Sequence, residues 1–246
     1  MTKPEMIIFD YGQTLVDEHG FDGVKGTAAV MKYAVKNKYN KTPEEIQTYA
    51  DALNKEIGRF DPDKRHLFQY ELPNSMFSAF LYESQGIEIA LSQEERDTIF
   101  WDAAAPGKAT EGIREFLIFL RERGIRTAVL SNISYCGEAV KRRIKECIPD
   151  YEFEFIIATS EYLYRKPNRH IFDLALEKAG LKAEEVWYVG DQYQCDVVGA
   201  KNAGMFPVWY TGAMDFRQEP DEPVLTVESW QDLKQVIGDL DEHDMV

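Results

Sequence analysis

The pattern of apolar and polar residues divides the chain into two kinds of segment. From about residue 18 to about residue 108, apolar residues recur at the spacing of amphipathic helices. The stretch "TPEEIQTYADAL" begins with Thr42 as an N-cap and a proline at the first helical position, and Glu45 follows three residues after the cap. "SQEERDTIFWDA" repeats this signal with Ser92 and Glu95. We therefore predict that residues 18–108 are helical.

From residue 112 onward, short apolar runs alternate with amphipathic helical segments. "GIREFLIFLRERG" is typical of a helix with one apolar face, and "IRTAVLSN" is typical of a buried strand. Three further helix and strand pairs follow: "GEAVKRRIKECI" with "FEFIIATS", "RHIFDLALEKAG" with "VWYVGD", and "DVVGAKNAG" with "FPVWYTG". This alternation predicts an α/β fold, a Rossmann-like parallel sheet with helices on both faces. We assign residues 1–17 and 109–246 to this core domain and residues 18–108 to a small all-helical domain.

Composition and charge limit the functions open to the chain. With 246 residues, 44% of them hydrophobic, the chain can bury a sizeable core. A formal net charge of −15 argues against binding nucleic acid, which needs clustered Lys and Arg. We expect small molecules or proteins as partners, and the sequence does not distinguish a monomer from a homodimer.

The expected location is cytoplasmic. No apolar run approaches the roughly 18 residues that a membrane span needs, and the start "MTKPEM" lacks the features of a signal peptide. Three cysteines without paired or metal-type spacing suit a reducing compartment. We therefore expect no membrane as a partner, and we expect the acidic end "DLDEHDMV" to be a solvated tail.

Candidate functional residues stand where the predicted strands end. They are Asp10, Ser131, Asn132 and Asp191 at or just after strand ends, Asp196 five residues beyond Asp191, and Lys166 at the start of the helix in "RKPNRHIF". In parallel sheets the ligand site lies beyond the carboxyl ends of the strands. Three carboxylates meeting there would repel one another unless positive charge lay among them. A hard divalent ion and a lysine would supply that charge.

Four motifs in this order resemble those of the haloacid dehalogenase-like superfamily, in particular its phosphatases with a helical cap. "IIFDYGQTL" is similar to the first motif, Ser131 in "AVLSN" to the second, Lys166 in "RKP" to the third, and "VGDQYQCDVVGAKNAGM" to the fourth. The resemblance extends from residue 5 to about residue 215, and the helical insert is similar to the family's small helical cap. It implies a hydrolase of phosphatase type that acts on a small phosphorylated metabolite.

The resemblance also implies roles for the matched side chains. Asp10 would attack the phosphorus of a bound phosphoester and form an aspartyl-phosphate, which water then hydrolyses. Ser131, Asn132 and Lys166 would bind the phosphoryl oxygens. The charge of Lys166 would also offset the neighbouring carboxylates.

The implied cofactor is Mg²⁺, and one of its implied ligands departs from the family's pattern. Asp10, the main-chain carbonyl of Gly12 and Asp191 would bind the ion, with Asp196 as a further ligand or an indirect partner. At position 12 the family's phosphatases usually carry a second aspartate, which protonates the leaving oxygen and later deprotonates the attacking water. The carbonyl survives the change to glycine, but the proton transfer does not. Because such catalysis contributes about 10²- to 10⁴-fold in rate, alkyl phosphates should suffer most.

Members of the superfamily that differ at this position suggest other chemistries. The dehalogenases have Tyr there and use no metal, whereas this chain keeps the metal-binding acids. Phosphonate-cleaving members have Ala there and use a cap lysine as a Schiff base, for which Lys25 could be proposed, although its surroundings do not match closely. Asp17, Glu18 and His19 could in principle donate a proton, but we expect this charged run at a turn to be solvated.

Two functions of different classes remain open. The first is a Mg²⁺-dependent hydrolase of small phosphorylated metabolites. The second is a binding or regulatory protein that keeps the phosphate and metal sites but has negligible turnover. The matched ligands favour the enzyme, because catalysis of phosphoryl transfer is mostly positioning and electrostatics.

Overall fold

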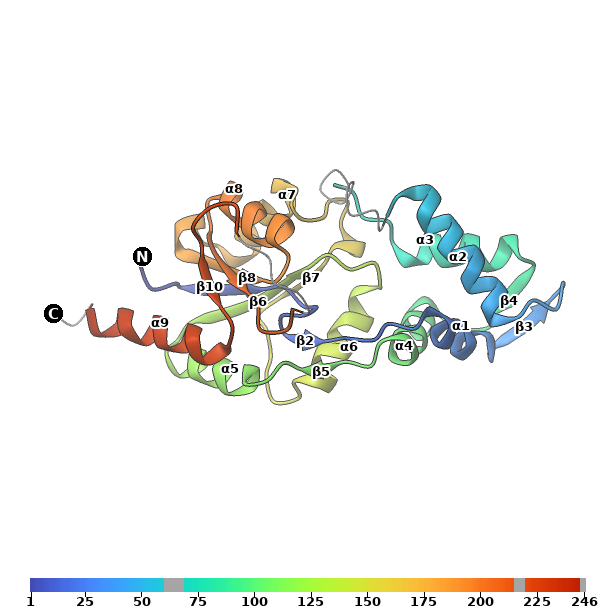
Figure 1. Ribbon diagram of the computed structural model, residues 1–246, viewed down its shortest axis with the longest axis horizontal. Coiled ribbons are helices and arrows are strands. Elements are labelled where there is room, and N and C mark those ends of the chain that lie inside the picture. Colours follow the sequence, from blue (N-terminus) through green and yellow to red (C-terminus); the bar gives the residue numbers. More distant parts are fainter. Residues whose placement is uncertain (60–68, 215–219, 244–246) are drawn as a thin grey trace.

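A six-stranded parallel sheet is the framework of the fold (Figure 1). The computed structural model describes residues 1–59, 69–214 and 220–243. In spatial order the strands are β10 (Leu225–Val227), β9 (Phe206–Tyr210), β8 (Val186–Gly190), β1 (Met6–Phe9), β6 (Arg126–Ser131) and β7 (Ile156–Ala158). All neighbouring strands in this sheet pair in parallel. The predicted α/β fold with a parallel sheet is confirmed.

Helices cover both faces of the sheet, because side chains alternate between the faces along each strand. Ile7 and Phe9 of β1 join the apolar cluster of one face, and Met6 and Ile8 join that of the other. The first face carries α5 (Ile113–Glu122), α6 (Gly137–Cys147) and α9 (Trp230–His243), and the second carries α7 (Arg169–Ala179) and α8 (Gly199–Ala203). The central strand β1 is therefore fully enclosed, and its end is held in place from both sides.

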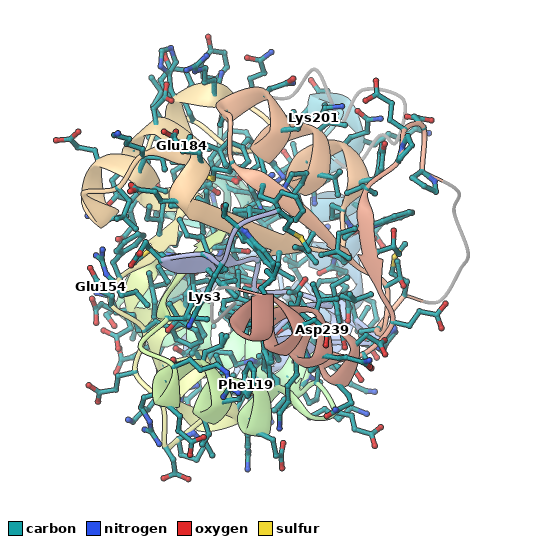
Figure 2. All side chains as sticks on the ribbon, turned by 90° about the vertical axis from the view of Figure 1, so that its left-hand side faces the viewer. Lys3, Phe119, Glu154, Glu184, Lys201 and Asp239 are labelled. Atoms are coloured by element: carbon teal, nitrogen blue, oxygen red, sulfur yellow. The ribbon has the colours of Figure 1, made fainter. Side chains whose placement is uncertain are left out.

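The first part of the expected acidic tail belongs to the C-terminal helix α9 and is not an extended tail. Its apolar side chains Trp230, Leu233 and Ile237 recur at helical spacing and are buried in the core. Figure 2 views this end of the molecule, where α9 lies beside α5 and Asp239 is on the outer surface. Asp239 thus lies on the exposed side of an amphipathic helix. Residues 244–246 of the expected tail lie outside the described residues.

The segment between the first strand and the rest of the sheet forms a second group of elements (Figure 1). The chain leaves the sheet through β2 (Val16–Asp17) and returns through β5 (Lys108–Ala109), and these two short strands pair antiparallel. Between them lie α1 (Gly23–Met31), β3 (Ala34–Asn37), α2 (Pro43–Ile57), α3 (Asn74–Ser84), β4 (Ile87–Ile89) and α4 (Gln93–Ala104). These elements have an apolar cluster of their own, made of Val30, Ile46, Ala50, Leu81, Tyr82, Ile87 and partly buried neighbours.

Local sequence signals explain most of this segment but not all of it. Both predicted capping boxes are present: Thr42 with Glu45 begins α2, and Ser92 with Glu95 begins α4. The segment is not entirely helical, however, because β3 and β4 pair antiparallel. These strands have four and three residues, too few for a recognisable alternation of buried and exposed positions.

Candidate active site

Three of the predicted site residues lie at the ends of three neighbouring strands, at one edge of the sheet. β1 lies between β6 and β8, so that Asp10, Ser131 and Asp191 emerge side by side at the carboxyl ends of these strands. The Asp10 main-chain N–H donates to the Val189 carbonyl over 2.8 Å, which extends the sheet to the site itself. This is the placement that the topology of a parallel sheet predicts.

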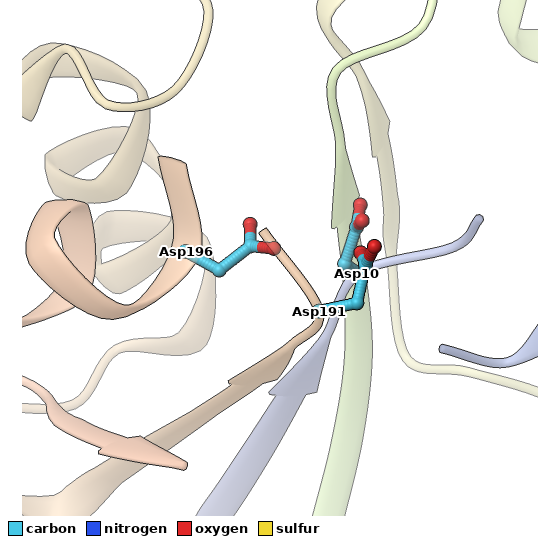
Figure 3. Close-up of side chains that lie close together, drawn as sticks. All are labelled: Asp10, Asp191 and Asp196. Carbon is cyan, nitrogen blue, oxygen red and sulfur yellow. The ribbon is translucent and has the colours of Figure 1, made fainter. Parts of the chain in front are cut away.

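Asp10, Asp191 and Asp196 form a buried acidic cluster (Figure 3). One carboxylate oxygen from each residue lies within 4.8 Å of the others. Asp196 reaches the cluster from the π-helical segment Tyr193–Val198, and its Oδ2 accepts a hydrogen bond from the Gln192 main-chain N–H at 2.8 Å. A Cβ at Gly190 would lie only 2.4 Å from the Asp196 Cγ, so only glycine lets this carboxylate approach the strand end.

Lys166 is the cation of the cluster. Its ammonium donates to Asp10 Oδ1 at 2.9 Å, to Asp196 Oδ1 at 2.6 Å and to the Tyr188 hydroxyl at 2.7 Å, and the side chain is 1% exposed. Burial by itself lowers the pKa of Lys166, but the charges of Asp10 and Asp196 outweigh burial, and the pKa is raised well above its usual range. Lys166 is therefore a permanent positive charge beside Asp10.

Two residues hold Lys166 in position, and only one of them was a sequence candidate. The Asn132 side chain accepts from the Lys166 main-chain N–H at 2.7 Å and donates to its carbonyl at 2.8 Å. Tyr188 donates its hydroxyl to the Leu130 carbonyl at 2.7 Å while it accepts from Lys166. Tyr188 was missed because an aromatic residue inside a strand is typical of the core. A direct phosphate contact for Asn132 stays a prediction.

The charges of the acidic cluster are not balanced by Lys166 alone. The buried Oδ1 of Asp191 has no hydrogen-bond partner among the residues that the structure describes. Burial, and then the charges of Asp10 and Asp196, raise the pKa of Asp191 well above its usual range. Burial and Asp10 also raise the pKa of Asp196 to about 6 against the opposing effect of Lys166. Clustered oxygen donors, one of them without a partner, fit a hard divalent cation.

A cavity of about 350 Å³ opens in front of this cluster. Among the residues that line it are Asp10, Gly12, Ser131, Asn132, Lys166 and Asp191. Asp196 does not line it and instead holds Lys166 from behind. The structure thus gathers all seven sequence candidates at one place, six of them on the wall of a single cavity.

Gly12 is not required by the backbone or by lack of space. Its φ lies outside the left-handed region that favours glycine, and a Cβ built there meets no described atom within 4 Å. A side chain at this position would have room. The absence of a carboxylate at Gly12 is therefore a chemical feature of the site and not a consequence of packing.

Glu18 corrects the expectation that the charged run 17–19 is solvated. Its side chain is 16% exposed and lines the same cavity. Its Oε1 accepts from the Tyr11 hydroxyl at 2.7 Å and lies 3.1 Å from Arg143 Nη2, and burial is the main cause that raises its pKa. No motif in the sequence marked Glu18, because its partner Arg143 lies 125 residues away.

A larger cavity of about 700 Å³ adjoins the first. It lies among α1, α2, α3 and α4, and its aromatic lining residues are Phe21, Phe77, Tyr82, Phe100 and Tyr135. Phe21 and Tyr135 line both cavities. A ligand held at the acidic cluster could therefore extend into an aromatic space between the helices.

The fold and this constellation define the class of protein. The family model of haloacid dehalogenase-like hydrolases matches residues 4–204, and the chain belongs to this family. In the described part of the chain, no helix is long and apolar enough to cross a membrane.

Two characterised relatives are phosphate-ester hydrolases. The chain is 36% identical over 236 residues to the pyrimidine 5'-nucleotidase YjjG of Escherichia coli. This match covers 96% of this chain and 98% of that protein. It is 27% identical over 209 residues to a glyceraldehyde 3-phosphate phosphatase of Pyrococcus abyssi, with coverage of 84% and 81%. Among solved structures, a haloacid dehalogenase-like phosphatase from Thermococcus onnurineus has the same fold, with a TM-score of 0.67, 18% identity and coverage of 97% and 98%.

Proposed function

We propose that this protein is a Mg²⁺-dependent phosphatase that hydrolyses a small phosphorylated metabolite through an aspartyl-phosphate at Asp10. The observation that carries the proposal is the single cavity in which the Asp10 carboxylate faces Ser131, Lys166 and Asp191. Membership of a hydrolase family and two phosphate-ester hydrolases among the relatives support it.

In this proposal Asp10 is the nucleophile. One carboxylate oxygen of Asp10 accepts a hydrogen bond from the Lys166 ammonium, which orients the group. The Asp10 carboxylate attacks phosphorus, and the Ser131 hydroxyl and the Lys166 ammonium hold the phosphoryl oxygens. Asn132, Tyr188 and Asp196 act through Lys166, because each of them bonds to it.

The carboxylates of Asp10 and Asp191 and the carbonyl of Gly12 would hold Mg²⁺. The partnerless Oδ1 of Asp191 supports its assignment as a ligand. When bound, the ion offsets the carboxylate charges and the negative charge of the phosphoryl group. Both oxygens of Asp196 already accept hydrogen bonds, which favours an indirect role for this residue.

We further propose that residues 1–17 and 109–246 act as the catalytic domain and that residues 18–108 act as a helical cap over the leaving group. The aromatic cavity of about 700 Å³ supports a leaving group with a planar ring. The three carbons of a triose phosphate would leave most of that space empty. Pyrimidine 5'-nucleotides, the substrate class in the name of the nucleotidase relative, are therefore the first class to test.

The test is a panel of phosphorylated metabolites assayed for phosphate release with Mg²⁺ and with EDTA. It should include uridine 5'-monophosphate, glyceraldehyde 3-phosphate and acetyl phosphate. We expect Mg²⁺-dependent release, with the highest kcat/KM on a nucleotide. Binding of nucleotides and Mg²⁺ without any release would instead support the binding or regulatory protein that Gly12 leaves open.

A further inference from the structure

The cavity at the acidic cluster contains one carboxylate that the proposed phosphatase does not use. Of its described lining residues, three carry carboxylates: Asp10, Asp191 and Glu18. The first is the proposed nucleophile and the second a proposed metal ligand. Glu18 has no role in that scheme. Its side chain is nevertheless largely buried, although burying a carboxylate costs free energy.

Glu18 is attached to both chain neighbours of Gly12. The hydroxyl of Tyr11 donates to Glu18 Oε1 at 2.7 Å, and the main-chain N–H of Glu18 donates to Gln13 Oε1 at 3.4 Å. These two contacts link Glu18 to the side chains of Tyr11 and Gln13, which flank Gly12 in the turn that follows the nucleophile. A Cβ at Gly12 would meet no described atom within 4 Å, so the region in front of this turn is open.

We propose that Glu18 performs the proton transfers for which the sequence of the first motif provides no carboxylate. This inference rests on the proposed phosphatase function. The carboxyl group that is absent at position 12 is thus supplied from eight residues after the nucleophile, by a side chain that lines the same cavity as Gly12.

In the proposed reaction Glu18 acts first as an acid and then as a base. The Asp10 carboxylate forms a bond to phosphorus, the bond from phosphorus to the leaving oxygen breaks, and the protonated Glu18 carboxyl gives its proton to that oxygen. The Glu18 carboxylate then takes a proton from water as the water oxygen attacks the aspartyl-phosphate. The bond from phosphorus to Asp10 breaks, which releases inorganic phosphate and returns both carboxyl groups to their starting states.

The surroundings of Glu18 suit a group that must change its charge. Burial favours the protonated form, whereas Arg143 and the Tyr11 hydroxyl stabilise the carboxylate that remains after proton donation. Arg143 also pairs with Asp102 and donates to the Ala105 carbonyl, so its charge is shared and does not serve Glu18 alone.

The decisive experiment combines Glu18→Gln with Gly12→Asp. Two quantities are measured: kcat/KM on glycerol 2-phosphate, an alkyl ester, and the rate at which phosphorylated Asp10 disappears after a pulse of acetyl phosphate with Mg²⁺, followed by mass spectrometry. Glu18→Gln should lower kcat/KM by about 10²- to 10⁴-fold and prolong the life of phosphorylated Asp10. Adding Gly12→Asp to Glu18→Gln should recover at least about tenfold, because position 12 lines the same cavity as Glu18.

Two further variants separate proton transfer from structure. Asp102→Asn removes the other carboxylate that pairs with Arg143. Asp102 does not line the cavity, so this variant should change both quantities far less than Glu18→Gln. Glu18→Asp keeps the charge beside Arg143 but shortens the side chain by one methylene, and should also be improved by Gly12→Asp. It replaces Glu18→Gln if circular dichroism shows that the latter does not fold.

The outcomes distinguish this inference from the function on which it rests. Loss of phosphorylated Asp10 at the wild-type rate in Glu18→Gln would overturn the role of Glu18 and leave the phosphatase standing. So would a double variant as slow as Glu18→Gln while Gly12→Asp alone is active, because that result assigns Glu18 a purely structural role. If no variant becomes phosphorylated at Asp10 or releases phosphate, both proposals fall together.

Discussion

Replacing Asp191 by asparagine should stabilise the metal-free protein and at the same time remove its stabilisation by Mg²⁺. Asp191 Oδ1 is buried without a partner in the described part of the chain, and the residue lies in a cluster of three carboxylates. Asp191→Asn keeps the size of the side chain, removes one negative charge, and adds an N–H that can donate to the remaining carboxylates. The wild-type residue is therefore a cost to the folded state that only a bound cation offsets.

The structure allows both effects to be estimated. A buried polar group without a partner costs about 1–3 kcal/mol. In EDTA, the free energy of unfolding of Asp191→Asn should exceed that of the wild type by about this amount. Mg²⁺ at 100 times its dissociation constant would add about 2.7 kcal/mol to the wild type and much less to the variant. The order of stability should therefore reverse between EDTA and Mg²⁺, as measured by urea unfolding followed by circular dichroism.

The difference in unfolding free energy between Asp191→Asn and the wild type should also depend on pH. The pKa of Asp191 is raised in the folded state, so the folded protein binds this proton more tightly than the unfolded chain. The resulting stability is complete below the unfolded pKa of about 3.9 and is lost as pH rises through the folded pKa. In EDTA the advantage of Asp191→Asn should grow with pH across this window. A variant less stable than the wild type in EDTA at neutral pH, or an equal gain from Mg²⁺ in both proteins, would refute the reasoning.

Three further substitutions test the nucleophile, the buried cation and the cap. Asp10→Asn should abolish phosphate release and leave the circular dichroism spectrum unchanged, because the amide oxygen still accepts from Lys166 but is a poor nucleophile; release at the wild-type rate would exclude the mechanism. Lys166→Met should lower the free energy of unfolding in EDTA by about 3–5 kcal/mol, since it leaves two buried carboxylates without their ion pair. A loss below about 1 kcal/mol would contradict the role of Lys166 as the buried cation of the cluster. Thr42→Ala, which removes the N-cap of α2, should cost about 1 kcal/mol in urea unfolding, whereas Thr48→Ala on the same helix is the control and should cost less.

The sequence predicted the site as far as topology alone determines it. Asp10, Ser131 and Asp191 lie at or just after the ends of apolar runs, and the parallel pairing of β1 with β6 and β8 brings these ends together. Lys166 could be placed beside them only through the order of the motifs, because the burial of its ammonium depends on partners 22 to 156 residues away. Helix starts were predictable because a capping box is a local interaction.

Features that depend on contacts between distant segments could not be predicted. Tyr188 in "VWYVGD" has the sequence pattern of an ordinary core residue, and its bond to Lys166 arises from the path of the chain before α7. Glu18 interacts with Arg143 on α6 and with Trp101 on α4, neither of which is near it in the sequence. The short strands β3 and β4 form because they pair with each other, not because either has a strong pattern of its own.

The geometry at Gly12 separates the chemistry of the site from the stability of the fold. The proposed metal contact at this position is a main-chain carbonyl, which does not depend on the side chain. The φ angle suits other residues, and a Cβ would meet no described atom within 4 Å, so a Cβ at position 12 adds neither backbone strain nor a clash. Its stability effect should therefore be small, because restriction of the unfolded chain contributes about 0.4–1 kcal/mol in favour while the added charge beside Asp10 opposes it. Metal binding, proton transfer and folding can thus vary independently at this turn, which allows the proton-transferring carboxylate to lie at Glu18 without disturbing Asp10 or Asp191.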